Sequence, residues 1–379
     1  MIQISGGSSL TQASAAPMAD IRKPEDPGAG LRIHLGHHFY GAGNLGDDLM
    51  LAGFLRELRQ IEPGAEVTGA VPFDRDALAR RFPGTRWSNI GREERRACIK
   101  DCDAWLGLGG SPFQHAQSRW FVDHLAEEAA LCRELGKPMW FLGIGVQTEG
   151  ELDDTTVRAV CSRARGIWTR DAASARRLRS SGASPHAAAA ADLAHLFFED
   201  NRPPSVQPGS VAVVANFDYG DWPGRDAALA ALEGTRPSRK IWLAQESRVL
   251  PGAERALFAA LPPERRRGWE LVSPDEPGAS LESALARWPG AEILLTSRYH
   301  AAITAAWAGS RVVVIGINEK LRGAAEELGT PLIGPTADRS EVERAIRDAV
   351  VRPAPRHLAA AARAACRQWL GAARGGLMR

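Results

Sequence analysis

A segment in the last third of the chain places a guanidinium and an imidazole where an apolar stretch gives way to an Ala-rich one. It reads Thr-Ser-Arg-Tyr-His-Ala-Ala over residues 296–302. Arg298 and His300 could reach one ligand if a strand ends here and a helix begins, with the helix N–H groups beneath them. An imidazole can deliver a proton near neutral pH, and a guanidinium binds carboxylate or phosphate with two hydrogen bonds. A lone histidine is usually structural, but Ser297-Arg298-x-His300 at the end of a strand is the stronger candidate for a ligand-binding site.

Other charged residues follow predicted strands in the same way. Lys320 comes just after the apolar run 312–315, and Arg170 ends the strand-like run 166–169. Either cation could bind an anion beside His300. The simpler alternatives are a solvated surface lysine for Lys320 and an ion pair with Asp171 for Arg170. Asp192, after an Ala-rich run, could close a further strand.

Three glycine-rich turns provide backbone that could approach a ligand closely. The first reads Tyr-Gly-Ala-Gly-Asn-Leu-Gly-Asp-Asp over residues 40–48 and precedes a helical pattern that Asp47 or Asp48 could cap. The other two turns contain Gly109-Gly110 and Gly145. A tight turn explains each of them about as well as a binding site does.

Short apolar runs alternate with helical periodicity along the chain, which is typical of parallel strands joined by crossover helices. The Pro-rich stretch 201–209 is the best linker, and the alternation restarts after it. We predict an α/β fold of two doubly wound, Rossmann-like domains facing a cleft, with ligands at the carboxyl ends of the strands. The expected units are a flexible leader at 1–30, domains at 31–202 and 210–350, and a C-terminal helix at 355–374. The expected strands are 32–36, 104–108, 139–144, 166–169, 211–215, 240–244, 270–272, 292–295 and 312–315.

Composition excludes several classes of function. Lys and Arg number 47 against 45 Asp and Glu, so the net charge of +2 gives no general attraction to nucleic acid. The five cysteines are scattered, no apolar run reaches membrane-spanning length, and the first thirty residues lack the features of a secretion signal. We expect a cytoplasmic protein with reduced cysteines and no metal site.

The expected C-terminal helix carries four arginines on one face, which are Arg356, Arg363, Arg367 and Arg374. The simpler interpretation is a solvated face on a closing helix. The alternative is a basic strip that contacts anionic lipid near a lipid-linked substrate.

Taken in order, these stretches resemble the polysaccharide pyruvyl transferase family over about residues 31–334. The turn at Gly145 and Arg170-Asp171 fit its pattern, with Lys320 downstream, whereas the middle run departs from three successive glycines and reads Gly-Leu-Gly-Gly-Ser over residues 107–111. Tyr299 stands where the family commonly has an apolar residue, and Asp192-Leu193 where it often has Asp-Pro; both put substrate preference in doubt. The matching residues of the first and last motifs are Tyr40, Gly41, Gly43, Asn44, Gly46, Asp47, Ser297, Arg298, His300 and Ala301.

The resemblance implies a glycosyltransferase-B type fold, phosphoenolpyruvate as donor substrate, and neither a cofactor nor a metal. It implies that His300 is the general acid and that the cations bind the donor's phosphate and carboxylate. The acceptor, a sugar that could be lipid-linked at the inner face of the membrane, would lie near Asn44 and Asp47, with Asp47 as base. The implied substrate-binding residues are Arg298, Lys320, Arg170, Ser297, Gly41, Asn44, Gly109, Gly110 and Gly145.

Two other functions stay open. A nucleotide-sugar glycosyltransferase on the same fold is favoured by Glu319 and Glu327, whose spacing recurs in nucleotide-binding halves of such enzymes but is also common by chance. A non-catalytic protein that binds sugar or an anion is the other. The sequence indicates neither the acceptor sugar nor the oligomeric state.

Overall fold

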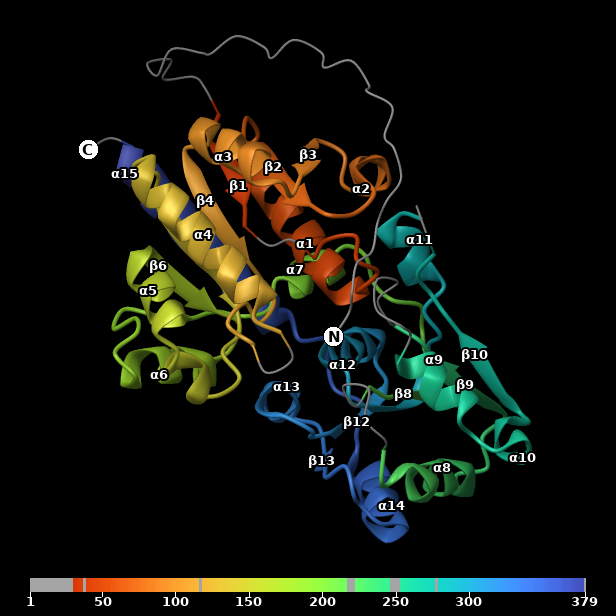
Figure 1. Ribbon diagram of the computed structural model, residues 1–379. Helices are drawn as coiled ribbons and strands as arrows, with labels where there is room; N and C mark the ends of the chain where they lie inside the picture. Colours follow the sequence, from red (N-terminus) through yellow and green to blue (C-terminus); the bar gives the residue numbers. More distant parts are fainter. Residues whose placement is uncertain are drawn as a thin grey trace, which may run out of the picture.

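The computed structural model describes residues 30–36, 39–115, 118–216, 222–245, 253–276 and 279–377. It arranges them as two α/β domains, with the last helix lying against the first domain (Figure 1). Apart from Gly30, the predicted leader lies outside these residues.

The N-terminal domain is built on a parallel sheet with strand order β3-β2-β1-β4-β5-β6-β7 in the described chain. Every residue of β4 and β5 is buried, as expected for central strands covered by helices on both faces. The strands are β1 (Arg32–Leu35), β2 (Glu66–Val71), β3 (Thr85–Asn89), β4 (Ala104–Leu108), β5 (Met139–Ile144), β6 (Ala164–Thr169) and β7 (Ala188–Ala189). The helices are α1 (Leu45–Ile61), α2 (Arg75–Arg81), α3 (Arg92–Asp101), α4 (Trp120–Glu134), α5 (Thr155–Arg163), α6 (Ala172–Ser180) and α7 (Ala194–Phe198), with a short 3-10 turn at Gly150–Leu152.

The C-terminal domain repeats this construction with the strand order β10-β9-β8-β11-β12-β13, again parallel throughout the part described. The strands are β8 (Gln207–Val214), β9 (Arg239–Leu243), β10 (Trp269–Val272), β11 (Ala291–Thr296), β12 (Arg311–Ile315) and β13 (Leu332–Ile333). The helices are α8 (Arg225–Gly234), α9 (Ala253–Ala259), α10 (Pro263–Arg266), α11 (Leu281–Ala286), α12 (Tyr299–Ala308), α13 (Glu319–Leu328), α14 (Arg339–Asp348) and α15 (Arg356–Leu377). The predicted fold class of two doubly wound parallel sheets is confirmed.

One hydrophobic core runs through both domains and α15. Phe54 of α1 packs edge to face on Trp369 of α15, with ring centroids 5.5 Å apart. The indole N–H of Trp307 in α12 donates to Nδ1 of His195 in α7 over 2.9 Å. Burial lowers the pKa of His195 to about 4, so its ring is neutral and able to accept this bond. Apolar contacts and a buried hydrogen bond therefore join the domains.

Three of the four arginines on the α15 face form ion pairs with the N-terminal domain. Arg363 pairs with Glu57 at 3.0 Å and also with Glu199, while Arg367 lies 3.8 Å from Glu57. Arg374 pairs with Glu62. This face is thus an ion-paired interface within the chain, a role that neither sequence-based alternative included.

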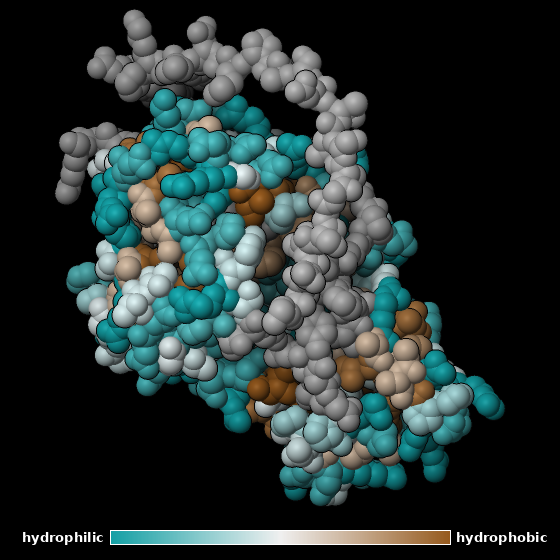
Figure 2. Space-filling view, in the orientation of Figure 1, coloured by the Kyte–Doolittle hydropathy of each residue, from teal (hydrophilic) through white to brown (hydrophobic). Residues whose placement is uncertain are grey.

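Hydrophilic residues cover most of the surface seen in Figure 2, and hydrophobic ones appear as small separate patches. Of the helices in the described chain, none combines the length and apolar character needed to cross a membrane.

Candidate functional site

His300 lies in the first turn of α12, which follows β11 after a two-residue turn. Its side chain is buried, and its ring packs against Gly46 in the first turn of α1. A Cβ on Gly46 would come within 1.9 Å of Nδ1 of His300, so only glycine leaves room for the imidazole. The N-termini of two helices, one from each domain, therefore meet at this histidine.

Asp192 is the acidic partner of His300. Its Oδ2 lies 3.3 Å from Nε2 of the imidazole, and its Oδ1 accepts the N–H of Ala194 over 3.0 Å. Burial opposes ionisation of this carboxyl, but the charges of His300 and Arg170 outweigh it and hold the pKa of Asp192 at about 2. An ionised carboxylate thus faces Nε2, while Nδ1 faces Gly46.

The ring of Tyr299 lies at the centre of the site. The His300 ring has its centroid 5.2 Å away, in an edge-to-face arrangement. Arg170 lies over the Tyr299 ring with its guanidinium carbon 4.8 Å from the centroid, and Lys320 does so with Nζ at 5.2 Å. The predicted acid and two predicted anion-binding cations therefore surround one aromatic side chain.

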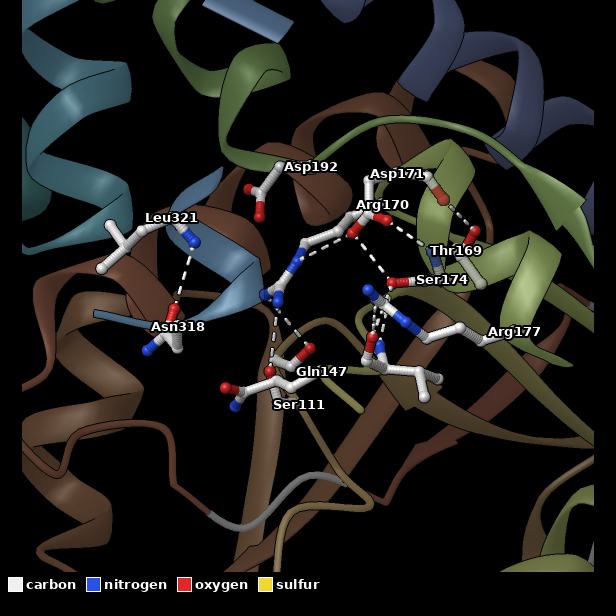
Figure 3. A network of polar contacts seen from close by, with 12 residues as sticks. Ser111, Gln147, Thr169, Arg170, Asp171, Ser174, Arg177, Asp192, Asn318 and Leu321 are labelled. Carbon is white, nitrogen blue, oxygen red and sulfur yellow. Dashed lines mark hydrogen bonds and ion pairs between the residues drawn. The ribbon is translucent and has the colours of Figure 1, made fainter. Parts of the chain in front are cut away.

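Arg170 follows the end of β6, and its guanidinium group reaches toward Ser111 in the turn after β4 (Figure 3). Its Nη1 donates to the carbonyl of Gly110 over 3.4 Å and its Nη2 to the hydroxyl of Ser111 over 3.2 Å. A Cβ on Gly145 would fall 2.2 Å from Nη2, so glycine is required there too. Nε also lies 3.6 Å from the carboxylate of Asp171. The predicted ion pair with Asp171 is thus present, and binding of an anionic ligand by Arg170 stays a prediction.

Lys320 enters from the first turn of α13, half-buried between the domains. Burial lowers its pKa to about 7, and Arg170 adds to that effect. Asp47 and Asp192 act in the opposite direction, and the positive charge of Arg298 again lowers the pKa. The simpler alternative, a solvated surface lysine, does not describe Lys320, since its Nζ lies over the buried ring of Tyr299.

Arg298 and Ser297 turn the chain from β11 into α12. Nε of Arg298 donates to the fully buried carboxylate of Glu254 over 2.5 Å, and a quarter of the arginine side chain remains exposed. The Ser297 hydroxyl accepts the N–H of Asn216 over 2.7 Å and donates to its carbonyl over 2.8 Å. Ser297 therefore ties the end of β11 to the end of β8, and its predicted contact with substrate stays a prediction.

On the N-terminal side, Asn44 caps α1 by accepting the N–H of Gly46 over 3.2 Å. The predicted cap by Asp47 or Asp48 is thus wrong, because the asparagine precedes both. The Asn44 amide also donates to Asp47 over 2.8 Å, which places the two predicted acceptor residues together. Gly41 has a φ of 76°, in the left-handed region that favours glycine.

Gly109 and Gly110 end β4 with φ of 69° and 72°, both in the left-handed region. A Cβ on Gly109 would come 2.7 Å from the sulfur of Met50 in α1, so this turn also packs directly on the helix that carries Asp47.

A chain of buried ion pairs lies beside the glycine loop 40–48 and was not predicted from the sequence. Asp48 accepts the N–H of Gly41 over 2.9 Å, and Nε of Arg81 lies 2.9 Å from its other oxygen. Arg81 also donates to Asp275 of the other domain over 2.9 and 3.2 Å. Burial raises the pKa of Asp48 to about 7 despite Arg81. These ion pairs connect the glycine loop to the C-terminal domain.

Two further residues, Asp192 and Glu327, were not predicted from the sequence to belong to this cluster, although Glu327 was considered for nucleotide-sugar binding. Asp192 gave one signal, its place after an Ala-rich run, which did not point to His300. Glu327 belongs to the same cluster, because burial and then Asp171 raise its pKa to about 8, with Arg170 acting against them. Among the described residues, no three His, Cys, Asp or Glu side chains are grouped as metal ligands.

The two doubly wound domains have a fold of the glycosyltransferase-B type. A putative UDP-N-acetylglucosamine 2-epimerase from Listeria monocytogenes is similar in structure, with a TM-score of 0.58 and 12% identity over 92% of this chain and 97% of that one. The UDP-GlcNAc 2-epimerase of Neisseria meningitidis gives 0.57 and 11% over 90% and 99%. Sucrose-phosphate synthase from Thermosynechococcus elongatus gives 0.53 and 14% over 92% and 98%. At these identities the likeness concerns the fold alone.

A comparison of the sequence with family models identifies the family to which the chain belongs. The family model for polysaccharide pyruvyl transferase matches residues 44–319, so the protein belongs to that family. The match begins at the cap of α1 and ends at the start of α13, and thus spans Asp192 and His300. No curated protein matches this sequence.

Proposed function

We propose that the protein transfers the pyruvyl group of phosphoenolpyruvate to two hydroxyl groups of a sugar, forming a cyclic ketal and releasing phosphate. The observation that supports this most is the cluster around Tyr299, where a histidine paired with a carboxylate adjoins two cations within about 5 Å of one ring. An acid beside anion-binding groups is what an enol phosphate donor requires.

The reaction begins with protonation of the donor's methylene carbon by His300, which leaves an oxocarbenium-like centre at C2. A sugar hydroxyl attacks C2 and gives up its proton, for which Asp47 is the proposed base. The bond between C2 and the phosphate oxygen then breaks, and phosphate leaves with the electron pair. The second hydroxyl closes the ketal at C2. Of the two hydroxyl protons, one replaces the proton that His300 delivered and the other accompanies phosphate.

The cations would act on the donor by charge. Arg298 is partly exposed and Lys320 half-buried, so both can meet an anion in the cleft. Arg170 lies deeper, over Tyr299, and adds fixed positive potential. Preorganised charges in a site shielded from water stabilise developing phosphate more strongly than water does.

The acceptor is proposed to bind against the N-terminal domain, near Gly41, Asn44 and Asp47 and the turns at 109–110 and 145. The family suggests a sugar acceptor in polysaccharide synthesis, and a lipid-linked unit at the inner membrane face is our proposal for it. A cytoplasmic location is part of the proposal, and it agrees with cysteines that are all free in the structure.

The test is to incubate the protein with phosphoenolpyruvate and a panel of simple and lipid-linked glycosides. We expect phosphate release coupled to a mass gain of one pyruvate less one water. His300→Ala should abolish turnover while donor binding survives, and His186→Ala, at an exposed histidine, should change neither. Turnover of a nucleotide sugar in place of phosphoenolpyruvate would instead indicate the glycosyltransferase alternative. Donor binding without turnover of any acceptor would indicate the non-catalytic one.

A further inference from the structure

Two positive side chains from different domains share one aromatic ring. Arg170 of the N-terminal domain and Lys320 of the C-terminal domain both lie over Tyr299, at 4.8 and 5.2 Å from its centroid. Since both distances are measured to the same point, the two charges are at most about 10 Å apart. The two cations repel each other. Arg170 is also held by Gly110, Ser111 and Asp171, but an attraction common to both cations is needed to keep them side by side before a substrate arrives.

The ring itself provides that attraction. The face of a phenol ring carries negative electrostatic potential, and a cation within about 6 Å of the centroid is attracted to it. The Tyr299 hydroxyl contributes little, because it is buried without a hydrogen-bond partner among the described residues. A buried unpaired hydroxyl is destabilising. The useful part of Tyr299 is thus the ring, which an aliphatic residue at this position would not supply.

We propose that Tyr299 is a positioning residue whose ring holds Arg170 and Lys320 in place, ready to receive the anionic donor. This inference rests on the proposed function and extends it to donor recognition. The ring also favours the charged form of Lys320, which is the form that binds an anion. Tyr299 would thereby set both the geometry and the charge of the donor site.

The charge on Lys320 depends on few neighbours. Arg170 and Arg298 face it with positive charge, and Asp47 and Asp192 with negative charge. With burial, these groups leave its pKa at about 7, so the free enzyme holds a mixture of charged and neutral lysine near neutral pH. Donor affinity should therefore fall as pH rises through that value, and removal of the ring should move the fall to lower pH.

The experiment compares Tyr299→Leu and Tyr299→Phe with the wild type, using KM for phosphoenolpyruvate, kcat and calorimetric binding of phosphoenolpyruvate. Measurements run from about pH 6.5 to 9, where a phosphate monoester is mostly ionised. We expect Tyr299→Leu to raise KM about 10-fold with a smaller change in kcat, since it loses both cation contacts. Its affinity should also begin to fall at lower pH than that of the wild type. Tyr299→Phe keeps the ring and should retain wild-type KM and pH dependence.

Lys320→Met serves as the reference, because it should bind weakly and without a transition across this pH range. Unchanged KM and an unchanged pH transition in a folded Tyr299→Leu variant would overturn the inference, as would equal losses in the Phe and Leu variants. If the Leu variant does not fold, Tyr299→Met tests the same loss with an unbranched side chain. A wild-type protein that neither binds nor turns over phosphoenolpyruvate would refute the proposed function itself, a distinct outcome.

Discussion

Gly46→Ala is the smallest change that should displace the proposed acid. Gly46 is in the first turn of α1, where alanine is ordinarily the better helix former by up to about 1 kcal/mol. The added methyl group would lie 1.9 Å from Nδ1 and 2.4 Å from Cγ of His300. Helix propensity and packing therefore predict opposite effects on stability, and the magnitudes decide between them.

Non-bonded carbon and nitrogen atoms rest about 3.5 Å apart, so the imidazole must move by roughly 1.5 Å or α1 must shift. Overpacking of this kind costs about 1–3 kcal/mol in buried sites, which exceeds the gain in helix propensity. A displacement near 1 Å of a catalytic group can reduce the rate about 100-fold. We therefore expect Gly46→Ala to lose about 100-fold in kcat and about 1 kcal/mol or more in stability.

The assay pairs phosphate release with urea unfolding. Gly371→Ala in α15 is the matched control, because a Cβ there would meet nothing within 4 Å. The control should be slightly stabilised, by less than about 1 kcal/mol, with unchanged kcat. If Gly46→Ala were also stabilised and kept its kcat within a factor of about three, His300 would not pack on α1 as described, and the reasoning would be refuted.

Two other substitutions test the buried ion pairs. Asp192→Asn should lower kcat about 100-fold with little effect on donor KM, because His300 loses its charged partner. The native carboxylate, whose pKa is depressed to about 2, contributes about 2 kcal/mol of stability above pH 4 that is lost as pH falls. The free energy of unfolding of the variant, measured with urea, should therefore decrease less steeply as pH falls below 4. Arg81→Met leaves Asp48 and Asp275 without their cation and should cost about 3 kcal/mol at pH 7.5. The loss should be smaller at pH 5.5, where Asp48 takes up a proton in the folded state, and a pH-independent loss would contradict this assignment.

Most of the strands that could be predicted are buried, although 270–272 lies in the edge strand β10. Residues 104–108 and 139–144 form continuous apolar runs between turns, and β4 and β5 occupy those ranges. β2 and β3 were not anticipated, because one is interrupted by Gly69 and the other is a polar strand at the sheet edge. Edge strands bury less surface, so their sequences carry a weaker hydrophobic signal.

The site residues also differ in how well they could be predicted: contacts within one turn can be inferred from the sequence, and contacts between distant positions cannot. Arg298 and His300 are placed by one strand-to-helix turn, which a short stretch of sequence reveals. The pairing of His300 with Asp192 joins positions more than one hundred residues apart, and β7 before Asp192 has only two residues. No local pattern encodes such a contact, because it depends on how two independently formed sheets dock.

The packing of the two domains against each other places His300 beside Asp192. His300, Tyr299 and Lys320 belong to the C-terminal domain, whereas Gly46, Asp192 and Arg170 belong to the N-terminal one. A motion that parts the domains would separate the imidazole from its carboxylate and Arg170 from the tyrosine ring. It would also break the bridge from Arg81 to Asp275. The contacts between the domains are therefore the same contacts that place His300 beside Asp192 and Arg170 beside Tyr299, so we expect a donor to meet all the proposed site residues only while the domains are packed together.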